Sequence, residues 1–127
     1  MTSTPLSILV IESHPLMRAA LCAAIADEPD MTIAAVAANG TDIMRTARLL
    51  QPNIVLLGLN NPGTDELNTL KMLRKKLPAA SILILTCDEA PEQKQTALEC
   101  GAQATLDKNA PRNELLRALR QLSAKSH

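Results

Sequence analysis

The feature that most constrains the fold is a regular alternation of short apolar segments with longer segments of helical periodicity. Each apolar segment, such as "SILILT", is too short for a helix and rich in branched residues, which is typical of a strand buried on both faces of a sheet. Neighbouring strands of this kind are parallel, because a helix carries the chain back over the sheet between them. The predicted strands are Ser7–Glu12, Met31–Ala37, Asn53–Leu57, Ser81–Thr86 and Ala102–Leu106.

The segments between the strands carry the signals of helix ends. Pro15 suits a first helical turn with Ser13 or His14 as its cap, and Pro29 closes the same segment. The next helix falls within "NGTDIMRTARLLQP". The remaining helices are expected at about Asp65–Lys76, at Pro91–Cys100 before a Gly101 cap, and at Pro111–Leu122. Periodicity turns two apolar faces inward: Ile43, Met44, Ala47 and Leu50 on one helix, and Leu115, Leu119 and Leu122 on the last.

Five strands alternating with five helices predict an α/β, flavodoxin-like (βα)5 domain with a doubly wound, parallel five-stranded sheet in the order 2-1-3-4-5. We expect residues 1–127 to form one such domain. Its switch point lies between the first and third strands, so Glu12, Ser13 and Gly58 should converge there, with Thr86 and Lys108 at the ends of the neighbouring strands.

Composition excludes several classes of protein. Lysine and arginine balance aspartate and glutamate at 13 each, and there is no Phe, Tyr or Trp, so neither a net charge nor a stacking platform attracts nucleic acid. No apolar run approaches the ~20 residues of a membrane helix, and the first residues lack a secretory signal. The three cysteines form no CxxC pair. We therefore expect a cytoplasmic protein without a membrane span or a zinc site.

The segments "ILVIESHPLMRAAL", "PNIVLLGLNNPGTDEL", "ILILT" and "ECGAQATLDKNAP" resemble, in order and spacing, the receiver domain of bacterial two-component response regulators. The His-Pro-Leu-x-Arg and Leu-x-Asn-x-Pro-Gly motifs are most similar to the branch that carries a LuxR-type DNA-binding domain. The resemblance implies a signalling domain rather than an enzyme. It also implies that any DNA binding belongs to a domain absent from this chain.

The resemblance implies a phosphorylation site in which two acids after the first strand and an aspartate ending the third hold Mg²⁺. That aspartate accepts the phosphoryl group, which a hydroxyl and a lysine then bind. Thr86 and Lys108 match the hydroxyl and the lysine, and Glu12 matches as an acid, but Ser13 replaces the second acid and Gly58 the acceptor. The chain also departs from the family at Thr105, in place of an aromatic residue, and at Asn61.

These departures predict a degenerate site, as in a pseudo-receiver. Glycine offers no oxygen nucleophile for phosphoryl transfer, and Mg²⁺ would keep only one of its three expected carboxylates, so we expect no Mg²⁺ and no other cofactor to bind. Lys108 should instead form an ion pair with Glu12 across the crevice. The alternative for Thr86 and Lys108 is that they still hold a small anion.

Two other functions stay open at this point. Another acid could accept the phosphoryl group, although Asp65 is expected to cap a helix, Asp88 lies in a loop, and Asp107 should point away from Lys108. The vacated crevice could also bind a small ligand and act as a sensor.

The leading prediction is signalling through protein contacts, to a partner or in a homodimer, made by the last two helices and the last strand. The surface expected there is formed by Ala97, Leu98, Lys108, Leu116 and Arg120. Other residues have unremarkable interpretations: Cys87 as a packed thiol, and Lys71, Arg74 and Lys75 as a solvated helix face.

Overall fold

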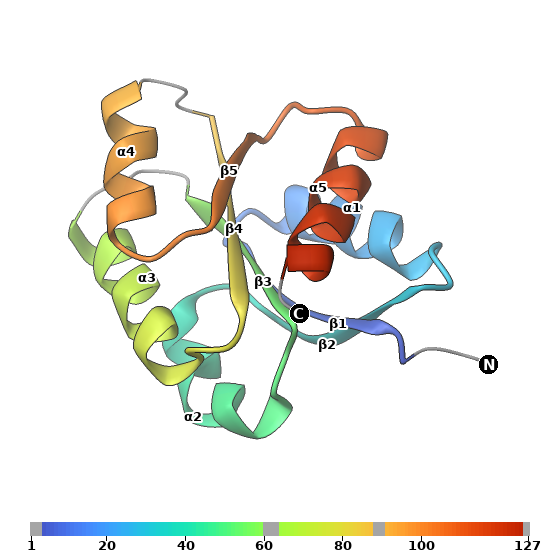
Figure 1. Ribbon diagram of the computed structural model, residues 1–127, viewed down its shortest axis with the longest axis horizontal. Helices are drawn as coiled ribbons and strands as arrows, with labels where there is room; N and C mark the ends of the chain where they lie inside the picture. Colours follow the sequence, from blue (N-terminus) through green and yellow to red (C-terminus); the bar gives the residue numbers. More distant parts are fainter. Residues whose placement is uncertain (1–3, 60–63, 88–90, 126–127) are drawn as a thin grey trace.

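A computed structural model describes residues 4–59, 64–87 and 91–125 (Figure 1). The strands are β1 Leu6–Ile11, β2 Met31–Ala37, β3 Ile54–Leu59, β4 Ser81–Thr86 and β5 Ala104–Asp107. The helices are α1 Pro15–Ala26, α2 Gly40–Leu50, α3 Thr64–Lys76, α4 Pro91–Glu99 and α5 Arg112–Lys125. The strands form one parallel sheet in the order β2-β1-β3-β4-β5, which confirms the predicted fold and topology.

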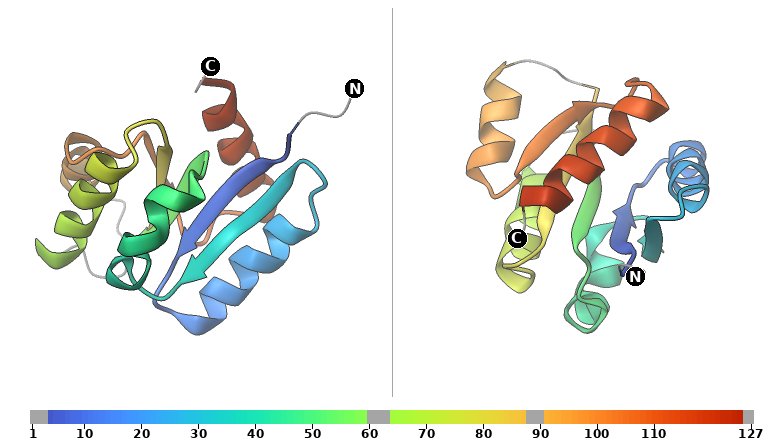
Figure 2. Two further views of the ribbon diagram at one scale, coloured as in Figure 1. Left: turned by 90° about the horizontal axis from the view of Figure 1, so that it is seen from below. Right: turned by 45° about the vertical axis from the view of Figure 1, so that its right-hand side comes forward.

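The sheet separates two apolar layers, which Figure 2 shows from two further directions. Helices α2, α3 and α4 pack on one face, where Leu70, Leu73 and Ala97 are buried. Helices α1 and α5 pack on the other, where Leu21, Ile25 and Leu119 are buried. The inward faces predicted for α2 and α5 are confirmed, because all of their residues belong to these two clusters. Within the described ranges, no helix combines the length and the apolar character needed to cross a bilayer.

Strand β3 is longer than predicted, and this places Gly58 inside the sheet. Its pairing with β4 runs from Ile54 opposite Ser81 to Leu59 opposite Thr86, with Gly58 opposite Leu85. Burial of the whole strand on both faces accounts for the extension, since Leu59 packs in the core beyond the glycine. The expectation that the strand ends at Leu57 was therefore wrong.

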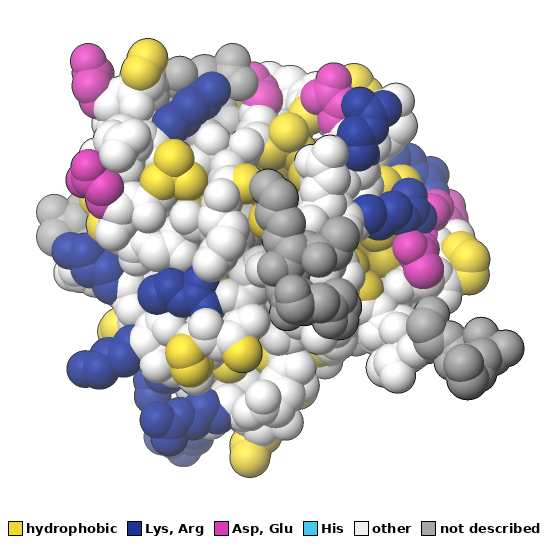
Figure 3. Space-filling model, in the orientation of Figure 1, with side chains coloured by type: hydrophobic (Ala, Val, Ile, Leu, Met, Phe, Trp, Pro, Cys, Tyr) yellow, Lys and Arg dark blue, Asp and Glu magenta, His cyan; other side chains and the backbone are white. Residues whose placement is uncertain are grey.

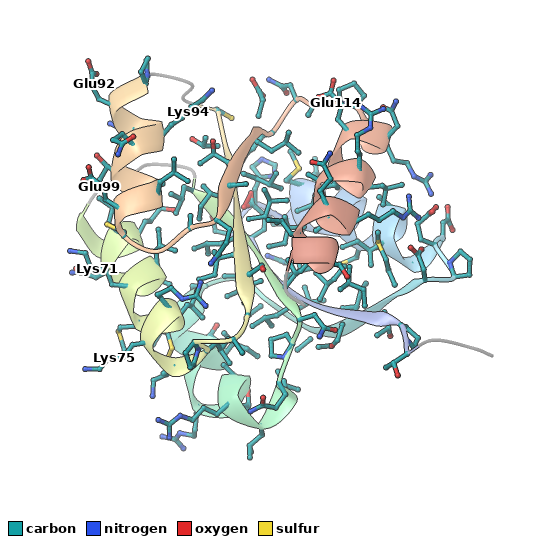
Figure 4. All side chains as sticks on the ribbon, in the orientation of Figure 1. Lys71, Lys75, Glu92, Lys94, Glu99 and Glu114 are labelled. Atoms are coloured by element: carbon teal, nitrogen blue, oxygen red, sulfur yellow. The ribbon has the colours of Figure 1, made fainter. Side chains whose placement is uncertain are left out.

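Arg74 is a structural residue rather than part of a solvated face. Its guanidinium donates to the backbone carbonyls of Leu77, Ala80 and Gly101, and to Oε1 of Gln103 at 3.1 Å. Desolvation by burial lowers the pKa of this guanidinium. Its alkyl stem lies close to Gly101, where φ is +123° and a Cβ would come within 2.9 Å of three stem carbons. Arg74 thus joins the end of α3 to the turns before β4 and β5, whereas Lys71 and Lys75 project into solvent as predicted (Figure 4).

Helix α5 is tied to the α1–β2 turn by a cluster of ion pairs. Arg120 contacts Glu28 at 2.6 Å and Asp30 at 2.9 Å, while Arg112 contacts Asp27 at 3.1 Å. The side-chain hydrogen bond from Arg120 lowers the pKa of Asp30. Basic and acidic side chains accordingly adjoin on the right of the surface in Figure 3.

Arg74→Ala should lower the free energy of unfolding by about 2–4 kcal/mol, because it removes four hydrogen bonds and the alkyl stem packed on Gly101. Urea unfolding followed by circular dichroism measures this loss. Lys71→Ala on the exposed side of α3 is the matched control and should change stability by less than about 0.5 kcal/mol. Equal effects of the two variants would contradict the assigned role.

The ion pairs of α5 should make stability sensitive to acid. Because the pKa of Asp30 is lower in the folded chain, its contribution is present above its unfolded pKa and is lost as the pH falls through the folded pKa. Arg120→Gln should therefore lower the unfolding temperature slightly at pH 7, with the difference disappearing as the pH falls through the folded pKa of Asp30. Thermal melts from neutral into acidic pH measure it, and a difference independent of pH would contradict the assignment.

Candidate functional site

The five residues expected to converge do lie together at the carboxyl end of the sheet. Glu12 and Ser13 follow β1, Gly58 lies in β3, Thr86 ends β4 and Lys108 follows β5. Parallel pairing puts these strand ends at one edge, and the backbone N–H of Lys108 donates to the carbonyl of Thr86 at 3.1 Å. The sheet order thus builds the predicted crevice.

A buried ion pair spans this crevice. Nζ of Lys108 lies 2.6 Å from Oε1 of Glu12, and their side chains are 4% and 0% exposed. The carbonyl of Glu12 also accepts a hydrogen bond of 2.9 Å from Nη1 of Arg18 in α1. The ion pair predicted from the sequence is confirmed. The contribution of Arg18 was missed, because a backbone acceptor leaves no sequence signal.

The carboxylate of Glu12 occupies the space that a side chain at position 58 would need. A Cβ placed on Gly58 would lie 1.7 Å from Oε2 of Glu12 and 2.7 Å from its Cδ. Any larger residue at position 58 would therefore force the Glu12 carboxylate to shift. The side chain of Glu12 extends from the end of β1 into this space, which Gly58 leaves empty because it has no side chain.

The second oxygen of Glu12 is less well satisfied than the first. Oε2 is buried, and the described part of the chain offers it no hydrogen-bond partner. An unsatisfied buried acceptor costs about 1–3 kcal/mol, more when charged. The ion pair to Lys108 thus has to offset the desolvation of a carboxylate that keeps one oxygen unpaired.

Two hollows flank the ion pair. A cavity of about 320 Å³ is lined by Ser13, Gly58, Thr69 and Glu66 together with apolar residues of β1 and β3. A shallower groove of about 420 Å³ has Glu12 and Lys108 at its floor and Leu16, Met17 and Cys87 among its walls. Ser13 thus lines the first hollow and the ion pair the second, so the crevice is divided.

The described residues contain no group of three His, Cys, Asp or Glu side chains placed to hold a metal ion.

The structure also shows where three other candidate residues lie. His14 serves as the cap of α1, where its Nδ1 accepts from the N–H of Met17 at 3.5 Å. Asp107 accepts a 2.7 Å hydrogen bond from the N–H of Asn109 in its own loop. Cys87 is exposed, so the expectation of a packed thiol was wrong.

The chain matches the family model of the response regulator receiver domain over residues 8–120. It belongs to the response regulator receiver family. The nitrate/nitrite response regulator protein NarL of Escherichia coli K12 is 37% identical over 94% of this chain, and NarP of the same strain is 31% identical over 93%. The receiver spans about half the length of these curated relatives, 56% and 55%.

Solved structures agree with the fold. A LuxR-family two-component response regulator from Aurantimonas sp. SI85-9A1 superposes with a TM-score of 0.86 at 28% identity, covering 97% of this chain and 87% of the other. The receiver domain of the response regulator NarL from Mycobacterium tuberculosis has a TM-score of 0.86 at 23% identity, with coverage of 96% and 98%. The receiver fold and the LuxR-type kinship inferred from sequence motifs are thereby confirmed.

Three of the five residues predicted to form the partner surface are buried. Ala97 and Leu116 pack in the core, and Lys108 is used by Glu12. Arg120 is exposed but directed to the α1–β2 turn, which leaves Leu98, 41% exposed, on α4 as predicted. Ala97 and Leu116 were misplaced because helical periodicity does not show which side of a helix its neighbours cover, and Lys108 because its side chain turns inward to Glu12. Asn61 and Asp88 lie outside the described residues.

The contact between Glu12 and Gly58 should appear as coupling in a double-mutant cycle. Glu12→Ala removes the carboxylate that is paired with the buried Lys108 and should cost about 3–5 kcal/mol. Gly58→Asp alone displaces the Glu12 carboxylate and should cost about 1–3 kcal/mol. In the double variant, the new carboxylate replaces the lost one beside Lys108. Its stability should exceed the additive expectation by at least about 1 kcal/mol in urea unfolding, and strict additivity would contradict this.

Proposed function

We propose that this receiver does not accept a phosphoryl group and signals through protein contacts. The observation that carries the proposal is the placement of the Glu12 carboxylate over Gly58, in a buried ion pair with Lys108. Glu12 already neutralises Lys108 inside the crevice. The charge of the crevice is therefore determined by the folded chain itself rather than by a bound phosphoryl group. The output of the receiver then depends on its surfaces and on what binds them.

The chemistry of the crevice supports this proposal. Phosphoryl transfer needs an oxygen nucleophile in line with the phosphorus and a cation to neutralise the equatorial oxygens. Gly58 supplies no oxygen, and Ser13 supplies no charge. Mg²⁺ prefers several hard oxygen ligands in octahedral geometry, whereas the carboxylate of Glu12 is buried and bound to Lys108. The residues present do not fit the ion.

The partner surface proposed for signalling is the outer side of α4, β5 and α5. Leu98 offers an exposed apolar contact there, and Figure 4 shows Glu92 and Glu99 projecting outward from α4 and Glu114 at the start of α5, on the other side of β5. Because the relatives are nearly twice as long, we further propose that the chain is the regulatory part of a LuxR-type transcription regulator in the cytoplasm. DNA would then be bound by a separate domain.

A second candidate function is a small-ligand sensor, which the cavity of about 320 Å³ beside Gly58 favours. Its lining combines apolar side chains with Ser13, Glu66 and Thr69, a composition common in ligand sites. A thermal-shift panel of anions and metabolites separates the candidates, since a sensor requires a ligand that raises the unfolding temperature.

Incubation with acetyl phosphate and Mg²⁺ should leave the intact mass of the wild-type chain unchanged. Amide resonances around Glu12 should likewise show no saturable shift up to millimolar Mg²⁺. Gly58→Asp should restore little labelling, because Ser13 still leaves the cation under-coordinated and Glu12 occupies the space. Glu12→Asp/Ser13→Asp/Gly58→Asp is the matched positive control for the donor. A gain of one phosphate by the wild-type chain would refute the proposed function.

A further inference from the structure

Positive charge is concentrated on the outer sides of two neighbouring helices, α2 and α3. Figure 3 shows Lys and Arg side chains gathered at the lower left, over these helices, with no acidic side chain among them. The whole chain carries no net charge, so most of the compensating acids lie on other parts of it. We call this region the α2–α3 basic surface, and its cations are Arg45, Arg48, Lys71, Lys75 and Lys76.

The sheet topology brings these cations together. Each helix between parallel strands returns the chain to the amino end of the sheet, so α2 and α3 run in the same direction. The two helices pack on the same face of the sheet, and they meet where Gly40 leaves space for the side chain of Thr69. The later residues of both helices, which include all five cations, therefore remain neighbours.

The cations of this surface have no acidic partner within the described part of the chain. The ion pairs found in residues 4–59, 64–87 and 91–125 use Lys108, Arg112 and Arg120 instead. The positive charge of α5 is thus largely neutralised by the α1–β2 turn, whereas that of α2 and α3 faces solvent. Unpaired charges of one sign attract a partner of the opposite sign.

The helix dipoles account for only part of this charge. Cations in the last turn of a helix stabilise the negative end of its dipole, and Arg48, Lys75 and Lys76 lie in such turns. Arg45 and Lys71 lie before the last turns, where this effect has fallen off. Solubility does not account for them either, because a mixture of both signs keeps a surface soluble. The uniform sign therefore indicates an anionic partner.

Two exposed apolar side chains are interspersed with the cations. Leu49 is 83% exposed and Met72 is 48% exposed. Leu49 lies four residues after Arg45 on α2, and Met72 lies four residues before Lys76 on α3, so each shares a helix face with a cation. A partner that fits this surface must offer negative charge and apolar contact together.

We propose that the α2–α3 basic surface binds an acidic amphipathic helix of a partner protein. Such a helix carries carboxylates and apolar side chains on one face at spacings of three and four residues, which matches the pattern on α2 and α3. A phosphate backbone has no apolar surface to cover Leu49 and Met72, and the chain has no aromatic residue on which bases stack. Two separate apolar side chains also do not make the continuous apolar face with which a helix enters a lipid surface.

This surface lies on other helices than the outer side of α4, β5 and α5. The proposal does not depend on whether the crevice accepts a phosphoryl group, so it and the proposed function fail independently. Exposed charge pairs are individually weak and are screened by salt. We therefore expect a dissociation constant on the order of 10⁻⁵ M at low ionic strength.

Titration of the full chain with a synthetic helix tests the proposal. The probe is a peptide of roughly 20 residues with Glu and Leu repeating along one face, and the control peptide has Gln in place of every Glu. Amide resonances of Arg45, Leu49, Lys71 and Met72 should shift saturably with the acidic peptide. Binding should weaken at least about 5-fold between about 0.05 and 0.5 M salt. A dissociation constant above about 1 mM, or equal binding of the control peptide, overturns the proposal.

Substitutions before the last turns locate the site. Arg45→Glu/Lys71→Glu reverses two exposed charges and should weaken peptide binding at least about 10-fold, with circular dichroism verifying the fold. Leu49→Ser should weaken binding at least about 3-fold, because it removes apolar contact without changing charge. Arg117→Glu reverses an exposed cation on α5 and is the matched control, expected within about 2-fold of the wild type. An equal loss in this control overturns the proposal.

Two other anionic probes identify the class of partner. Duplex DNA and vesicles containing phosphatidylserine are titrated into the same chain at the same salt concentration. The amides of α2 and α3 should respond to the acidic peptide at lower concentration than to either probe. Tighter binding of DNA or of vesicles at these residues overturns the proposal in favour of that partner.

Discussion

The buried ion pair between Glu12 and Lys108 is the interaction on which the crevice depends. It joins residues 96 positions apart, from the strand end of β1 to that of β5, across β3 and β4. Burying two charges is costly, and close mutual contact offsets the cost, so removing either partner alone is expected to destabilise the fold. The absence of a side chain at Gly58 accommodates the pair, because a Cβ there would lie 1.7 Å from Oε2 of Glu12 and the carboxylate would have to shift. Glu12, Lys108 and Gly58 thus belong to one packing arrangement.

In the pattern that the family resemblance implies, an aspartate at the end of β3 lies near the lysine. Here the carboxylate beside Lys108 belongs to Glu12, which follows β1. Were the acid on β3, its oxygens would stand at the switch point, where a donor can approach in line. With Glu12 the carboxylate arrives sideways from β1, is fully buried and has one oxygen bound to Lys108. A ligand shifts a conformational equilibrium only through a difference in affinity between two states. A crevice whose charge is fixed by packing has no such difference in charge to offer, and this is the physical basis of the proposal that surface contacts carry the signal.

The fold was predictable because each level of the sequence agrees with it: buried strands, helix ends and inward faces all indicate one sheet order. The Glu12–Lys108 pair followed from the same topology, since it brings both strand ends to one edge. The hydrophobic periodicity could not show how far individual side chains extend or which groups they contact. Whether Glu12 extends over Gly58, or Arg74 reaches four acceptors on two turns, depends on side-chain conformation and on the neighbours of each loop. The retained glutamate, one methylene longer than aspartate, was the available signal for the first.

Helix α1 links the crevice directly to the outer surface. It begins three residues after Glu12, and Nη1 of Arg18 holds the carbonyl of that same residue. On its inner side α1 packs Leu21 and Ile25 against the same sheet that carries the ion pair. Thermodynamic linkage is reciprocal: whatever stabilises one position of α1 from outside stabilises the matching arrangement of Glu12 by the same free energy. A contact made on the outer side of α1 would therefore be coupled to the crevice through Arg18 and Glu12.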